Sequence, residues 1–167
     1  YWCRVEAISG YESMKKEIME PPLKVVKEYL KKGKVTRAVS LAFLHLVFKC
    51  TDDRTLYYRY ILKNSNLSGT YDIAIAYAGP FDFITVYVLN CVKASEKIQW
   101  IHFDVSKFHF NTKMRRRLYP KFDHIHVVSE EARKALVAKV PTIEPKTRTV
   151  LNVVSEKQCR RMADMGH

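Results

Sequence analysis

The sequence is short of acidic residues, and this shortage sets its charge. Its 17 Asp and Glu stand against 29 Lys and Arg, which gives a net charge of +12 and a pI near 9.6. Such a charge fits nucleic acid, an anionic membrane surface or phosphorylated substrates, but equally a solvated basic surface. The basic residues are spread along the whole chain, and no zinc finger, RNP-like motif or helix-turn-helix is recognisable. This weakens the case for nucleic acid as the partner.

Glycine and cysteine are also scarce, and their spacing excludes several classes of protein. None of the five glycines is adjacent to another, and the chain has no P-loop, no G-x-G-x-x-G and no nucleophile-elbow serine. This argues against P-loop NTPases, dinucleotide-binding enzymes and serine hydrolases. The four cysteines form no C-x-x-C pair, so we expect reduced thiols, a cytosolic location and no zinc site. No apolar segment reaches the roughly 20 residues needed to span a bilayer.

What the sequence does contain is the balance of a globular domain. It is 47% hydrophobic and 28% charged, which argues against disorder, and 167 residues fit one domain. We expect residues 1–70 to be mostly helical, 71–164 to alternate strand and helix, and 165–167 to be a linker or tag remnant. Because the chain starts with Tyr1, we expect it to be a piece of a longer protein.

In the first part, turn and capping residues predict the helix ends. After a strand over 1–8, a helix should break near Glu20 and restart at Pro21 or Pro22, since proline suits the first turn. Gly33 should end that helix. A third helix is expected over 34–49. A fourth, with Thr51 as its N-cap, should run to about residue 64.

The second part shows short apolar runs separated by helix-like spacers, as expected for a parallel sheet. Strands are predicted over 72–77, 97–102, 124–128 and 147–153. Helices should lie over 81–93, from Ser129 to Pro141, and from Ser155 onward. The predicted fold class is α/β, a Rossmann-like parallel sheet flanked by helices. Ligands of such sheets bind where strands end at their carboxyl side, and there His102 follows an apolar run.

An ordered set of segments resembles the N-terminal domain of glycosyltransferase family 4. The segments are Tyr71–Ala76, Ile98–Asp104, Phe122–Glu130 and Lys146–Asn152. The resemblance covers roughly residues 71–164 and implies half of a GT-B architecture. It implies a retaining glycosyltransferase (hexosyltransferase type) of polysaccharide or glycolipid assembly. Such an enzyme moves sugar from a nucleotide-sugar to a glycan or lipid-linked acceptor, without metal or other cofactor, in the cytoplasm or at the inner membrane face.

The chain departs from this family at its beginning. The family's first strand and its Gly-rich loop have no counterpart in this sequence, so we expect the sheet to lack that first strand. The strand at Asp72 would then be an open edge, covered by residues 1–8 or by a second copy in a homodimer. The C-terminal donor-binding domain is missing as well, so we expect the isolated chain to be catalytically inactive.

The resemblance places His102 at the cleft, in contact with the donor sugar or its phosphate, and makes it the candidate catalytic residue. An imidazole there can donate a hydrogen bond to a hydroxyl or phosphate oxygen, although it could also simply cap the strand end. Asp104 could bind an acceptor hydroxyl or orient His102, or it could cap the following loop. Gly79 could offer an N–H to an anion or merely form a turn. Ser129 and Glu130 should cap a helix and could also bind substrate.

Basic and aromatic residues are densest between residues 104 and 121. Lys107, Arg115 and Arg116 could hold a phosphorylated or lipid-linked acceptor, or contact an anionic membrane surface. The alternative is a solvated helix face with its aromatic residues in the core. His124 and His126 alternate along a strand, so they share a face, and we expect them to pack there without a metal.

Two other functions stay open beside glycosyl transfer. One is a non-catalytic basic α/β module that binds nucleic acid or a protein partner. Its affinity for nucleic acid would fall steeply with salt. The other is a peripheral membrane module acting through residues 12–64 and 107–119.

Overall fold

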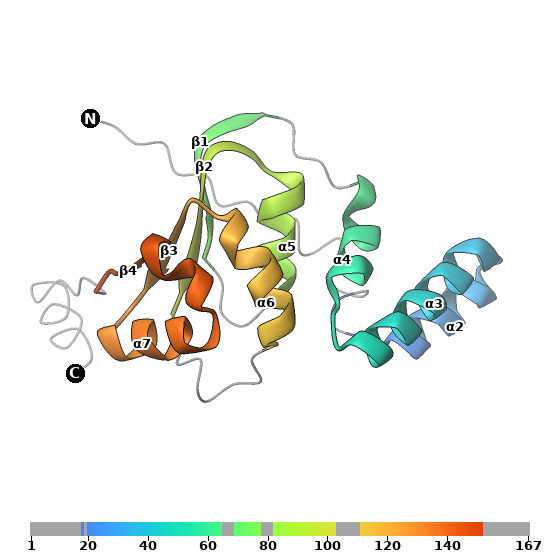
Figure 1. Cartoon of the computed structure of the whole chain (residues 1–167). Coiled ribbons are helices and arrows are strands. Elements are labelled where there is room, and N and C mark those ends of the chain that lie inside the picture. Colours follow the sequence, from blue (N-terminus) through green and yellow to red (C-terminus); the bar gives the residue numbers. More distant parts are fainter. Residues whose placement is uncertain (1–17, 19, 65–68, 78–81, 103–110, 152–167) are drawn as a thin grey trace, which may run out of the picture.

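The computed structural model describes residues 18, 20–64, 69–77, 82–102 and 111–151. A four-stranded sheet lies at the centre with helices packed beside it, and a helical hairpin extends away from the sheet (Figure 1). The predicted α/β class, with a parallel sheet flanked by helices, is confirmed. None of the helices within these ranges is long and apolar enough to cross a membrane.

The N-terminal helices begin and end largely where turn residues predict. Helix α2 spans Pro22–Lys31, and Gly33 follows it with a φ of +70°, which a residue without a Cβ adopts at little cost. Helix α3 spans Val35–Thr51 and α4 spans Thr55–Ile61, which the short 3-10 helix η2 (Leu62–Asn64) extends.

The prediction that Thr51 caps a new helix is wrong. Thr51 is the last residue of α3, and its hydroxyl donates to the carbonyl of Val47 at 2.8 Å. Asp52 then ends α3 in the left-handed region, with a φ of 54°. The carboxylate of Asp53 accepts the Thr55 N–H at 2.8 Å at the start of α4. Helix α3 thus continues for two residues, Cys50 and Thr51, beyond its predicted end.

The strands are β1 (Thr70–Ala76), β2 (Lys93–Ile101), β3 (His124–Val127) and β4 (Thr147–Thr149). They are all parallel and lie in chain order, with Ile75 opposite Ile98, and Ile98 opposite His124. Helix α5 (Asp82–Cys91) joins the first pair. Helix α6 (Thr112–Leu118) and the 3-10 helix η3 (Tyr119–Lys121) precede β3, and α7 (Glu130–Lys139) with η4 (Pro141–Lys146) precedes β4.

Pairing between neighbouring strands makes the strand ends differ from the predicted ranges. Strand β2 begins four residues earlier than predicted, since Lys93 already pairs with Thr70 of β1. The predicted helix before it accordingly ends at Cys91. Strand β4 ends at Thr149, although the Val150 N–H still donates to Val127 at 2.8 Å.

One face of the sheet is fully buried. Strands that advance in one direction through right-handed crossovers place all their connecting helices on the same face, and Figure 1 shows α5 and α6 on one side of the strands. Ala76, Ile101, Ile125 and Val127 of that face are completely buried. The buried Gln99 satisfies its amide there, accepting from Thr85 at 2.8 Å and donating to the Ala76 carbonyl at 3.2 Å. The core therefore fixes the sheet against α5–α7.

Strand β1 lies at one edge of the sheet and exposes apolar side chains on the opposite face. In the described part of the chain no strand lies beyond β1, and Ile73, Ile75 and Tyr77 are exposed there. The predicted cover by residues 1–8 and the predicted helix from Ser155 lie outside the described residues. The homodimer through this edge stays a prediction.

Candidate functional site at the carboxyl edge of the sheet

Four parallel strands bring their carboxyl ends to one edge. Tyr77 follows β1, His102 follows β2, Ser129 and Glu130 follow β3, and Thr149 ends β4. Side chains at this edge of an open parallel sheet are the ones best placed to meet a ligand. The topology therefore brings together three of the predicted site residues, namely His102, Ser129 and Glu130.

His102 is held in a cluster of rings. Its ring centroid lies 4.2 Å from that of Tyr77 in an edge contact, and 5.6 Å from that of Trp100 in a nearly parallel stack. Burial lowers the pKa of His102 and so favours the neutral form of its imidazole. Its Nε2 is shielded from solvent and has no hydrogen-bond partner among the described residues. A neutral imidazole at this edge can donate one hydrogen bond and accept another.

The ring cluster continues across the sheet. The ring centroids of His126 and Trp100 lie 5.2 Å apart, and those of His124 and His126 lie 6.4 Å apart in a stack. Both histidines therefore share one face, as predicted. Burial lowers the pKa of His126, and the nearby His124 and Arg148 add to the effect. Within the described ranges, Trp100 Nε1 and His126 Nδ1 also lack hydrogen-bond partners. Three ring nitrogens on this face thus retain unused hydrogen-bonding capacity.

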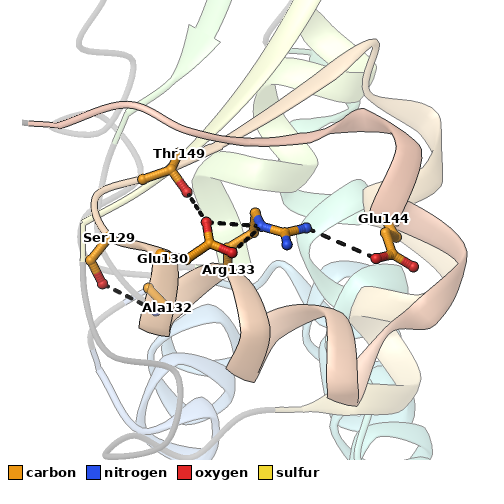
Figure 2. A network of polar contacts seen from close by, with 6 residues as sticks. All are labelled: Ser129, Glu130, Ala132, Arg133, Glu144 and Thr149. Atoms are coloured by element: carbon orange, nitrogen blue, oxygen red, sulfur yellow. Dashed lines mark hydrogen bonds and ion pairs between the residues drawn. The ribbon is translucent and has the colours of Figure 1, made fainter.

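Ser129 and Glu130 form a network with the end of β4 (Figure 2). The Ser129 hydroxyl caps α7 by accepting the Ala132 N–H at 3.1 Å, as predicted. The Glu130 carboxylate accepts from Arg133 Nε at 2.9 and 3.1 Å and from the Thr149 hydroxyl at 2.9 Å. These hydrogen bonds, that of Arg133 first, lower the pKa of Glu130.

This network ties three elements together at the edge. Arg133 also lies 4.0 Å from Glu144 of η4, so α7, η4 and β4 share one set of polar contacts (Figure 2). Both predicted binding residues therefore have partners within the chain. Their role toward substrate stays a prediction.

The three consecutive arginines of α6 each bind a different partner. Arg115 is buried at 2% exposure, and its guanidinium lies 2.7 Å from Asp82 at the start of α5. Arg116 is exposed and donates from Nε to the Lys139 carbonyl at 3.1 Å. Arg117 pairs with Asp53 at 2.7 Å. These contacts dock α6 against α5, α7 and the turn before α4, and the predicted contact of Arg115 and Arg116 with substrate is not tested.

The remaining predicted binding residues, Gly79, Asp104 and Lys107, lie outside the described residues. Within those residues, no group of three or more His, Cys, Asp or Glu side chains is placed to hold a metal ion.

A basic cavity at the opposite, amino edge of the sheet was not predicted from the sequence. It has a volume of about 470 Å³, and four of its lining side chains are cations, namely Arg59, Lys97, Arg117 and Lys121. Lys97 Nζ donates to the Leu89 carbonyl at 3.1 Å, and burial lowers the pKa of Lys97. The four cations come from four separate elements, so no sequence spacing could have revealed them.

Comparison with known proteins adds no family assignment. The chain matches no model of a known protein family, no curated protein and no solved structure.

Proposed function

We propose that this chain is the acceptor-side half of a retaining glycosyltransferase that moves a sugar from a nucleotide-sugar to a glycan or lipid-linked acceptor. The observation that carries the proposal is His102. It follows β2 at the carboxyl edge of an open parallel sheet, its burial favours the neutral imidazole, and its Nε2 has no partner as far as the structure is described. The resemblance to glycosyltransferase family 4, over residues 71–164, names the reaction.

The ring cluster supports a role in binding sugar or nucleotide. Tyr77 is exposed beside His102, and aromatic faces with nearby hydrogen-bond donors suit the apolar and polar sides of a pyranose or a base. His102 can bond a hydroxyl or phosphate oxygen of the substrate without changing its charge. In the proposed enzyme, the leaving diphosphate is stabilised chiefly by a second domain that this chain does not contain.

The test uses a protein that carries this chain together with the proposed donor-binding domain, and a panel of nucleotide-sugars. His102→Ala should lower transfer by a factor of 10 or more, because a hydrogen bond to the reacting substrate is lost. His124→Ala is the matched control, since it removes the same side chain from the same face at the amino end of β3. Equal activity of wild type and His102→Ala would remove His102 from the site. Absence of transfer with every donor would contradict the proposed reaction.

The isolated 167-residue chain should turn over no nucleotide-sugar, because the donor-binding domain is absent. Turnover by this chain alone would contradict the proposal that a second domain binds the donor.

The basic cavity favours a second candidate function, a binding module for anionic ligands. Arg59 and Lys121 line it with no partner among the described residues. If the chain binds nucleic acid there, affinity should fall steeply between 50 and 200 mM salt, and Arg59→Gln with Lys121→Gln should reduce it. Weak binding that these substitutions leave unchanged would count against this function.

A further inference from the structure

The hairpin of α2 and α3 has two apolar surfaces, of which one packs against other described residues and the other does not. On the inner surface, Val25 of α2 and Ala38 and Leu41 of α3 are buried, and Arg37 lies over the Tyr29 ring at 4.9 Å. This packing accounts for one apolar stripe on each helix, which is what a surface helix normally needs.

The second apolar surface of α3 lies in solvent. Val35, Val39, Phe43 and Leu46 recur at intervals of four, four and three residues, which places them on one face of the helix. Each is between 55% and 63% exposed, and the exposed Cys50 extends the same face by one more turn. On α2, Leu23 and Leu30 are seven residues apart and are 59% and 49% exposed. Single exposed apolar residues are ordinary, but a stripe of this length marks an interaction surface.

The tip of the hairpin combines these apolar residues with positive charge. Leu30 and Val35 flank the turn, which carries the exposed Lys31, Lys32 and Lys34. The whole hairpin from residue 22 to residue 51 has a single acidic residue, Glu28, beside seven basic ones: Lys24, Lys27, Lys31, Lys32, Lys34, Arg37 and Lys49. Apolar side chains beside lysines are the composition of helices that lie in the interface of an anionic membrane.

The hairpin is also placed to reach a flat surface. It extends away from the sheet (Figure 1), while its base is tied to the body through the turn after α3. There the Asn111 amide donates to the Asp52 carbonyl, and Asp53 pairs with Arg117 at 2.7 Å. The tip can therefore enter a surface without disturbing the core.

We infer that the α2–α3 hairpin docks the protein onto an anionic membrane surface, with Val39, Phe43 and Leu46 in the acyl-chain boundary and the tip lysines at the phosphates. A membrane fits better than nucleic acid, because nucleic acid would use the lysines and leave the apolar stripe in water. The inference goes beyond the proposed sugar transfer and does not depend on it.

The experiment measures flotation of the 167-residue chain with vesicles of phosphatidylcholine alone or with 30% phosphatidylserine. We expect binding only to the anionic vesicles. Replacing Lys31, Lys32 and Lys34 by Ser should weaken binding on the order of 100-fold, since each basic residue near such a surface contributes about five-fold. Val39→Ser with Phe43→Ser should weaken it by about ten-fold or more, by removing apolar area that leaves water on docking.

Two matched controls separate the hairpin from the overall charge and from exposed apolar residues elsewhere. Lys63, Lys93 and Lys134 are exposed on other elements, and their triple replacement by Ser changes the net charge equally. Ile73→Ser with Ile75→Ser removes two exposed apolar side chains from β1. Both controls should bind vesicles almost as wild type does, and circular dichroism checks that every variant is folded.

Three outcomes would overturn the inference. One is equal loss in the hairpin and control lysine variants, which would mean attraction of the whole basic chain. Another is absence of binding to anionic vesicles by the folded wild-type chain. The third is that the chain does not bind vesicles but self-associates, and that Val39→Ser with Phe43→Ser abolishes this self-association. The stripe would then bind a second copy of the chain.

Discussion

The ion pair between Arg115 and Asp82 offers the sharpest test of how α5 and α6 are held together. The guanidinium is 2% exposed and the carboxylate 23% exposed, with 2.7 Å between them. Removing one partner from a buried pair costs roughly 3–5 kcal/mol, because the other charge stays without its counterion in a poorly hydrated place. The cost should depend on which charge remains, because only one of them can reach water.

In Arg115→Met, the charge left behind is Asp82, which is partly hydrated. We expect a loss of about 3 kcal/mol in the free energy of unfolding, at the lower end of that range. In Asp82→Ala the charge left behind is the buried guanidinium, and the loss should be nearer to 4 kcal/mol. The double variant should lose less than the sum of the two single variants, because the second substitution no longer breaks the pair.

The assay is urea unfolding followed by circular dichroism, with the midpoint and slope fitted for each variant. Arg116→Met is the matched control, since this exposed neighbour donates one hydrogen bond among the described residues, to the Lys139 carbonyl, and its replacement should cost below about 1 kcal/mol. Equal stability of Arg115→Met and Arg116→Met would refute the reasoning. A double variant that loses the full sum would refute the coupling.

Three further predictions concern a helix cap and two titrations. Ser129→Ala should lower the free energy of unfolding by about 1 kcal/mol, because it removes the hydroxyl that caps α7. Ser129→Asp should keep most of this stability, and urea unfolding measures both variants. Burial raises the pKa of Tyr119 from 10.0 to about 12, so the unfolded chain releases this proton first as the pH rises. Between pH 10 and 12 the wild type should lose about 2 kcal/mol of unfolding free energy that Tyr119→Phe keeps, and an equal loss in both proteins would contradict this. Burial lowers the pKa of His126 below 6.5, so its contribution to stability is complete above pH 6.5 and is lost as the pH falls below that value. His126→Gln should therefore be less sensitive to acid than the wild type, and a midpoint that shifts equally with pH in both proteins would count against it.

The strand–helix alternation of the second half could be predicted because its signals are local. Apolar runs bounded by turn residues predict β1 to β4, and Ser129 followed by two acidic residues predicts α7. The helix boundary at Thr51 could not be placed in this way. A threonine followed by two aspartates can start one helix or end another, and the packing of α3 decides between these alternatives.

The candidate site was predictable only in outline. Parallel strands bring their carboxyl ends together, so His102 and Ser129 were expected at one edge, and they lie there. The ring contacts of His102 with Tyr77 and Trp100 depend on the register of β1 and β2, which no local pattern encodes. The same limit applies to Arg115, whose burial against Asp82 joins residues 33 positions apart.

The sequence by itself determined the class of fold, the excess of positive charge and the edge at which polar residues would gather, because these follow from composition and from the period of each element. Only the tertiary structure decided which cations are buried, which imidazole nitrogens lack partners and which apolar residues of α3 face solvent. The physical reason is that exposure and pairing depend on neighbours from distant segments. A helix with apolar residues on two faces reads the same whether one face or both are covered.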